Sequence, residues 1–200
     1  MFKRLSYKFA NILVNNEIVE SEDFEIYRYG FETLIYFIVN ILVALFIGII
    51  FDRFIHTVIF LSCYCTLRQF TGGYHARNYK ECTLTFAVIY LITIFSANNI
   101  DINKYKYLLV LLMIISILTI YKLAPLEHRN KPLSESEKKH YRKTVQKILF
   151  VIICLIILCK ILNIFQQYVI YAIISIYWIA ILIYIGMKVN SDQSDYKTFS

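Results

Sequence analysis

The sequence is poor in residues that break helices and in charged residues. Its 200 residues include only five glycines and two prolines, and 18% of them are charged whereas 58% are hydrophobic. A soluble domain of this length has too much surface to bury so much apolar side chain. The bilayer removes that difficulty, and the shortage of glycine and proline favours long uninterrupted helices. We therefore expect an all-α integral membrane protein, with residues 1–200 forming a single polytopic membrane domain.

Other missing features exclude several classes of site and partner. The chain lacks a phosphate-binding glycine loop and an H-E-x-x-H motif, and Cys63 and Cys65 have no histidine near them, so we expect no metal and no cofactor. The five cysteines are odd in number and four lie inside apolar runs, which argues against a disulfide framework. The net charge of +7 comes from residues between apolar runs rather than along one soluble face, so nucleic acid is not an expected partner. The first ten residues do not lead into the apolar stretch and small-residue cleavage site of a signal peptide.

Six apolar runs indicate six helices, at residues 33–51, 54–67, 82–97, 107–123, 148–165 and 168–187. The second run would reach only about 21 Å as a straight helix, so it is either a thin span or a re-entrant segment. If all six cross and the N-terminus is cytoplasmic, about 17 of the 21 lysines and arginines lie inside. This bias favours six transmembrane spans over residues 33–187, with a cytoplasmic tail at 188–200.

The segment before the first run has an amphipathic pattern. Phe2, Leu5, Phe9 and Ile12 recur at helical intervals, with basic residues between them. The pattern predicts a cytoplasmic helix lying in the membrane interface within residues 1–30. A helix that simply packs against the protein accounts for the pattern equally well.

Candidate chemistry is concentrated in residues 68–82, which connect the second and third runs. Cys82 is the one cysteine at the edge of a run. If a helix begins there, unpaired backbone N–H groups and the positive end of the helix dipole favour the thiolate, and so do Arg77 and Lys80. The alternative is a small apolar residue that begins a span.

His75 and a pair of glycines precede this cysteine. Seven helical residues would separate His75 from Cys82 by about 10.5 Å, so direct contact requires a bend in the backbone. Gly72 and Gly73 make irregular backbone plausible just before the histidine. His75 is thus a candidate general base, although a lone loop histidine is more often simply solvated.

Two further polar residues have both a structural and a functional interpretation. Arg68 either anchors its span by reaching toward water, or binds a substrate carboxylate or oxyanion. Asn40 lies within the first run, where it either marks an interior cavity or bonds to a neighbouring helix.

Residues 68–82 resemble the accessory gene regulator B family of bacterial quorum-sensing systems. The likeness rests on the Arg-x-x-x-Gly-Gly-x-His stretch from Arg68 to His75, with Cys82 downstream at the entry to a span. It also covers the layout of the chain, which has six apolar runs, a basic central loop and short tails.

This resemblance implies a membrane-embedded cysteine endopeptidase of the bacterial cytoplasmic membrane. It implies cleavage of a short AgrD-like precursor peptide and its cyclisation to a thiolactone or lactone signal. Cys82 would be the nucleophile and His75 its base, with Arg68 and the Gly72-Gly73 pair supporting the oxyanion or substrate. The partners implied are the precursor and the lipid bilayer, with a homodimer left open. A small transporter or exporter without proteolytic chemistry, and an anchoring scaffold, are the alternatives.

Overall fold

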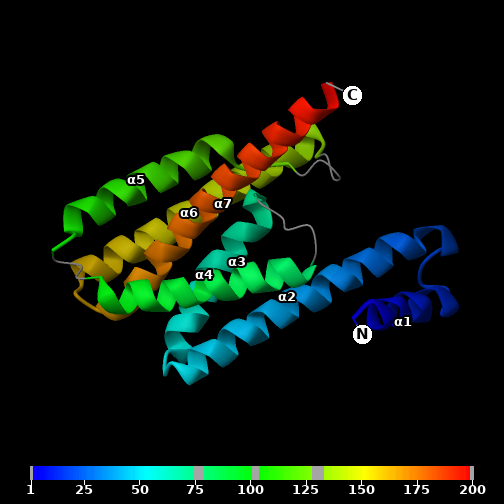
Figure 1. The fold of residues 1–200 in the computed structure, drawn as a ribbon, viewed down its shortest axis with the longest axis horizontal. Coiled ribbons are helices and arrows are strands. Elements are labelled where there is room, and N and C mark those ends of the chain that lie inside the picture. The colour runs from blue at the N-terminus through cyan, green and yellow to red at the C-terminus, as the bar shows by residue number, and fades with distance from the viewer. Residues whose placement is uncertain (1, 74–78, 101–103, 128–132, 199–200) are drawn as a thin grey trace.

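The computed structural model describes residues 2–73, 79–100, 104–127 and 133–198, and these ranges are almost entirely helical (Figure 1). The helices described are α1 (Phe2–Asn15), a short 3-10 helix η1 (Ser21–Asp23), α2 (Phe24–Ile50), α3 (Phe54–Thr71), α4 (Tyr79–Asn99), α5 (Lys106–Leu123), α6 (Glu135–Ile161) and α7 (Gln166–Thr198). The expected all-α bundle is confirmed.

Several helices extend beyond the apolar runs, because local polar interactions set their ends. Before α6, Ser134 and Glu137 form a capping box, in which each side chain bonds the other's backbone N–H. The helix therefore begins within the basic segment that was expected to be a loop. The predicted interfacial segment at 1–30 likewise ends early, with α1 stopping at Asn15 and α2 starting at Phe24. Part of the predicted tail at 188–200 belongs to α7.

The short second run forms α3, which crosses the bundle rather than re-entering it. Its first residues follow the end of α2, where the Phe51 ring lies 5.9 Å from that of Phe95 near the end of α4. Its last turn lies at the opposite end of the bundle, where the Phe70 ring is 5.8 Å from that of Tyr141 in the first turns of α6. Thus α3 runs from one end of the bundle to the other, as expected for the thin span and not for the re-entrant segment.

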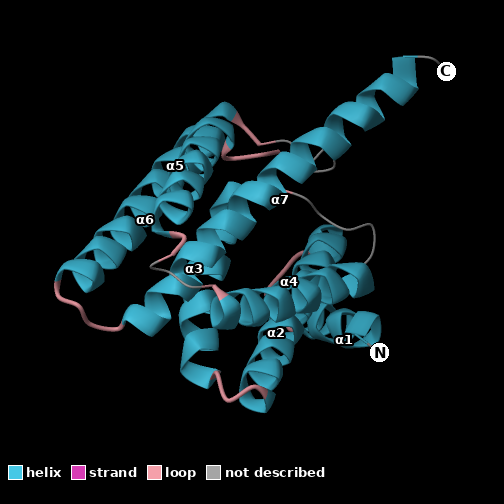
Figure 2. Ribbon diagram, turned by 60° about the vertical axis from the view of Figure 1, so that its left-hand side comes forward, coloured by secondary structure: helices cyan, strands magenta, loops and turns pink. Residues whose placement is uncertain are grey.

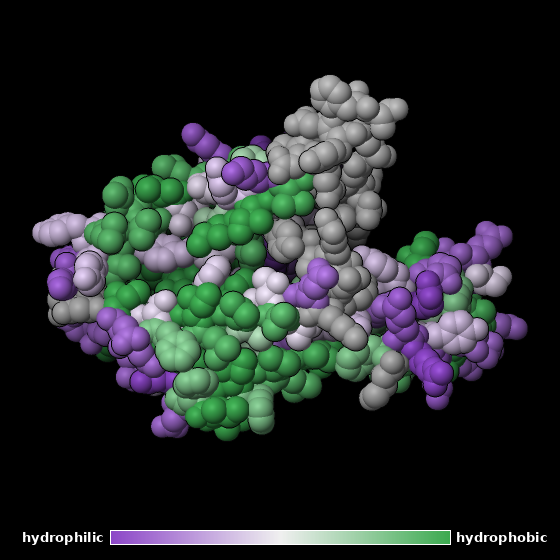
Figure 3. All heavy atoms as spheres, viewed as in Figure 1, coloured by the Kyte–Doolittle hydropathy of each residue, from purple (hydrophilic) through white to green (hydrophobic). Residues whose placement is uncertain are grey.

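The core is built around α7, and the other long helices present apolar surface outward. Five helices (α2, α4, α5, α6 and α7) are long and apolar enough to cross a membrane, and 67% of the α7 span is buried against 11–28% of the others. By contrast, Phe46 on α2, Leu111 on α5 and Phe150 on α6 expose 54–68% of their surface. Figure 3 shows apolar side chains covering the middle of one face, with polar ones at its edges. This distribution suits a bundle surrounded by lipid.

Helix α1 lies along the first half of α2, antiparallel to it. The rings of Phe2 and Tyr36 are 5.2 Å apart, and those of Phe9 and Phe31 are 5.5 Å apart. Leu5 and Ile12 nevertheless remain 40% and 53% exposed. Helix α1 therefore packs against α2 and leaves part of its apolar side chains exposed, and its location in the membrane interface stays a prediction.

The prediction of six spans leads to a test of orientation. Ser136 in α6 and Asn99 at the end of α4 are exposed and lie at opposite ends of the bundle. A single cysteine is engineered at each of these sites in a variant without the native cysteines. In intact cells, an impermeant thiol reagent should label the cysteine at Asn99 but not the one at Ser136. Ser136 should react only after the membrane is opened. Labelling of Ser136 from outside would refute a cytoplasmic location for the α5–α6 connection.

Candidate active site

The C-terminal end of α3 turns sharply through two glycines that hold Arg68. Gly72 and Gly73 have φ values of 65° and 115°, a region that favours glycine. The Arg68 guanidinium donates from Nη1 to the Gly72 carbonyl oxygen. A Cβ on Gly73 would collide with that Nη1 and lie 3.1 Å from the Leu182 carbonyl oxygen of α7. Both glycines are therefore needed for the turn that fixes the partly buried Arg68.

The segment after α5 braces this turn from the other side. Leu126 donates its backbone N–H to the Thr71 carbonyl oxygen at 2.9 Å, and Gly72 forms a parallel bridge with Leu126. The bracing segment is itself tied to α6, because Arg142 donates to the Ala124 carbonyl oxygen at 3.3 Å. The described parts of two connections that are distant in sequence are thus joined by backbone hydrogen bonds at this end of the bundle. Sequence reasoning missed this contact, because no local pattern relates Leu126 to Thr71.

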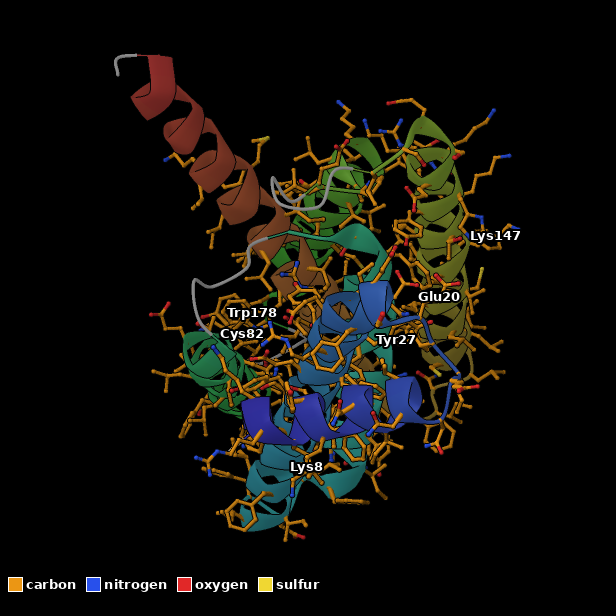
Figure 4. All side chains as sticks on the ribbon, turned by 90° about the vertical axis from the view of Figure 1, so that its right-hand side faces the viewer. Lys8, Glu20, Tyr27, Cys82, Lys147 and Trp178 are labelled. Atoms are coloured by element: carbon orange, nitrogen blue, oxygen red, sulfur yellow. The ribbon has the colours of Figure 1, made fainter. Side chains whose placement is uncertain are left out.

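Cys82 lies in the first turn of α4, beside α2 (Figure 4). Helix α4 begins three residues before Cys82, so the expected position near a helix N-terminus is confirmed. Its thiol is half-buried and hydrogen-bonded to the Asn40 side chain of α2. The Arg68 and Tyr64 side chains of α3 are close enough to Cys82 to interact with it electrostatically.

The surroundings of the sulfur act in opposite directions on its charge. The Arg68 cation and a hydrogen-bond donor both stabilise a thiolate, whereas partial burial favours the neutral thiol. The ring of Tyr64, buried and 5.5 Å from that of Phe86, forms an apolar wall next to the site. The arrangement offers a thiol whose anion would have specific partners, at the border between apolar bundle and polar connection.

The structure brings together four of the five residues predicted for the site. Arg68, Gly72 and Gly73 form one turn, and Cys82 lies within electrostatic range of Arg68. His75 lies outside the described residues, so its predicted role stays a prediction. The sequence marked Asn40 as an unusual amide inside an apolar run but did not identify its partner.

Other candidates are placed in packing roles. Cys63, Cys65 and Cys159 are partly buried and pack against the core, and Cys154 is exposed on α6. His56, near the start of α3, is buried with its ring 4.5 Å from that of Tyr168.

Fold and site together define a multi-pass helical membrane protein with a cysteine at the start of one helix, faced by an arginine and an amide. Comparison with known proteins specifies the class further. A profile described as "Accessory gene regulator B" matches residues 6–184. The chain belongs to the accessory gene regulator B family, as its sequence predicted.

Similar proteins come from two bacterial species. The chain is 29% identical over 168 residues to an AgrB-like protein 2 of Clostridium perfringens (strain 13 / Type A), covering 81% of this chain and 78% of that one. It is 30% identical over 169 residues to an AgrB-like protein of strain SM101, with the same coverage. It is 27% identical over 152 residues to accessory gene regulator protein B of Staphylococcus aureus (strain bovine RF122 / ET3-1), covering 75% and 80% of the two chains. No solved structure matches.

The glycine turn leads to a prediction about Cys82 reactivity. In a variant whose other four cysteines are replaced by alanine, Gly73→Ala should slow alkylation of Cys82 by iodoacetamide at neutral pH by about threefold to tenfold. The reason is that the new Cβ displaces the Arg68 guanidinium, and the thiolate loses its nearby cation. The matched control is Gly30→Ala, where an added Cβ meets nothing within 4 Å. Equal alkylation rates in both variants would show that the turn does not position Arg68 for the thiol.

Proposed function

We propose that this protein is a membrane-embedded cysteine endopeptidase that processes a short AgrD-like precursor peptide in quorum sensing. Membership of the accessory gene regulator B family supports the link to that signalling system. The observation that carries the chemistry is the environment of Cys82, whose thiol has a hydrogen-bonding amide from α2 and a cation from α3. A packing cysteine needs neither group.

The proposed reaction begins with deprotonation of the thiol. His75 accepts the Cys82 proton, and the thiolate attacks the carbonyl carbon of the scissile peptide bond. Negative charge moves to the carbonyl oxygen, where nearby donors stabilise it. The C–N bond then breaks, the imidazolium of His75 returns its proton to the leaving amine, and the C-terminal part of the precursor departs. The N-terminal part remains as a thioester on Cys82.

The second half of the reaction closes the ring. A thiol or hydroxyl within the bound peptide gives up its proton and attacks the thioester carbonyl. The bond between the carbonyl carbon and the Cys82 sulfur breaks, and Cys82 leaves as a thiolate that takes up a proton. A tethered nucleophile has a high effective concentration, so it competes well with water. The apolar wall beside Cys82, formed by Tyr64 and Phe86, supports this preference because it limits the access of water to the thioester.

Alanine substitutions test the proposed pair. Cys82→Ala and His75→Ala should each abolish cleavage of a short precursor encoded beside the gene when the two are co-expressed, with product masses as the readout. Protein level and membrane insertion should stay close to wild type, and for Cys82 this is expected because its side chain is not part of the buried core. The control replaces Cys63, Cys65, Cys154 and Cys159 together and should retain measurable activity. Efficient processing by Cys82→Ala would end the cysteine-protease proposal.

The thioester can be trapped. If the internal nucleophile of the precursor is changed to alanine, ring closure cannot occur and only slow hydrolysis remains. We expect a covalent adduct on Cys82 with the mass of the N-terminal fragment, released by hydroxylamine and absent from Cys82→Ala. Cleavage of the altered precursor without such an adduct, even after rapid quenching, would indicate water as the direct nucleophile.

A further inference from the structure

An amide inside a membrane-spanning helix has to be accounted for. Asn40 lies in the middle of α2, among residues that are mostly apolar. A polar group in such surroundings costs free energy unless it is hydrogen-bonded, so its partner is informative. The partner is the Cys82 thiol of α4. Asn40 Oδ1 is buried and, among the described residues, accepts no hydrogen bond, so the amide Nδ2 is the group that bonds the sulfur.

The direction of this bond matters for chemistry. An N–H donor stabilises a sulfur that carries negative charge more than one that carries a proton. A donor within hydrogen-bonding distance of Sγ also lies close to any carbonyl that Sγ attacks. When the charge passes from sulfur to the carbonyl oxygen, the same N–H group needs to move only slightly to follow it.

We propose that Asn40 is a catalytic residue whose amide donates first to the Cys82 thiolate and then to the oxyanion of the attacked peptide carbonyl. This role rests on the proposed function, in which Cys82 is the nucleophile. Asn40 supplies an N–H donor from α2 and Arg68 supplies a positive charge from α3. Together with Cys82 on α4, the site is therefore assembled from three helices. Within the part of the chain that the structure describes, the buried Oδ1 accepts no hydrogen bond, which fits an amide that is held in place for its N–H group.

The competing explanation is a purely structural contact that joins α2 to α4. Such a contact would affect protein level and thermal stability, but it would not change the processing rate of protein that is correctly folded. An experiment on the thiol tests whether Asn40 stabilises the thiolate without any precursor, and an experiment on processing then separates the two roles. The full-length protein with Cys82 as its only cysteine serves as the reference.

The first arm measures the rate of Cys82 alkylation by iodoacetamide between about pH 6 and pH 10. Asn40→Leu keeps the volume of the side chain, removes the donor and suits an apolar span. We expect it to move the midpoint of the alkylation profile upward by about one pH unit, since a bond to a charged group is lost. Asn40→Gln retains a donor and should recover part of the shift. Ile41→Ala, a packing change on the same helix, and Asn99→Ala, an exposed amide bonded only within its own helix at 2.8 Å, should leave the midpoint unchanged.

The second arm measures processing of the co-expressed precursor in a background that retains all other cysteines. Asn40→Leu should lower the rate by about 10²- to 10³-fold, the usual effect of removing one oxyanion donor, with protein level near wild type. An unchanged alkylation midpoint, or unchanged processing, in a membrane-inserted Asn40→Leu protein would overturn the role of Asn40. A thermal unfolding midpoint near wild type shows that this variant is folded. Failure of the wild-type protein to process the precursor would instead count against the proposed function, because the alkylation arm does not depend on it.

Discussion

The hydrogen bond from Arg68 to the Gly72 carbonyl is the interaction on which the site depends. A guanidinium remains charged at all accessible pH values, and near the end of an apolar helix its donors must find acceptors within the protein. The turn after α3 provides one, but only because Gly72 and Gly73 adopt positive φ angles and carry no Cβ. The close approach of Leu126 and Leu182 to this turn follows from the same two glycines. Charge, backbone shape and packing are therefore coupled at one point.

A membrane protein has few ways to place irregular backbone near the bilayer. Unpaired N–H and C=O groups are tolerated there only when other parts of the protein satisfy them. In the described parts of the two connections at this end of the bundle, the bond from Leu126 to Thr71 and the bond from Arg142 to Ala124 do this. Helix α7, which contributes the Leu182 carbonyl, also has the largest buried share of the five candidate spans. Figure 2 shows it between the pair α5 and α6 and the pair α2 and α4. A turn held between α7 and the α5–α6 connection has little freedom, and a rigid surrounding is what a preorganised catalytic group requires.

The sequence predicts the fold well, because apolar periodicity and helix breakers are local properties. It identifies six helices, and the charge bias supports a crossing α3 that hydropathy alone leaves uncertain. It predicts helix ends less well, since the capping box at Ser134 and Glu137 continues α6 into a basic segment that resembles a loop. The site is only partly predictable. Arg68, Gly72, Gly73 and Cys82 are found from one short segment, whereas the contact of Asn40 with Cys82 depends on how α2 and α4 pack. A single sequence contains no direct signal of that packing, and only the cost of an amide in an apolar span marks Asn40 as unusual.

The position of Cys82 at the border of the bundle reconciles two demands of the proposed chemistry. A thiol deep among apolar side chains would remain protonated, because nothing would balance the charge of its anion. A thiol in open water would lose any thioester to hydrolysis. In the first turn of α4, Cys82 interacts with Arg68 and Asn40, and the rings of Tyr64 and Phe86 lie near it. Arg68 and Asn40 offset part of the cost of burying a charged sulfur, so the protein supplies some of the stabilisation that water would otherwise give. A thioester formed there would persist until a nucleophile held in the same place attacks it, and a group within the bound peptide meets that condition better than bulk solvent does.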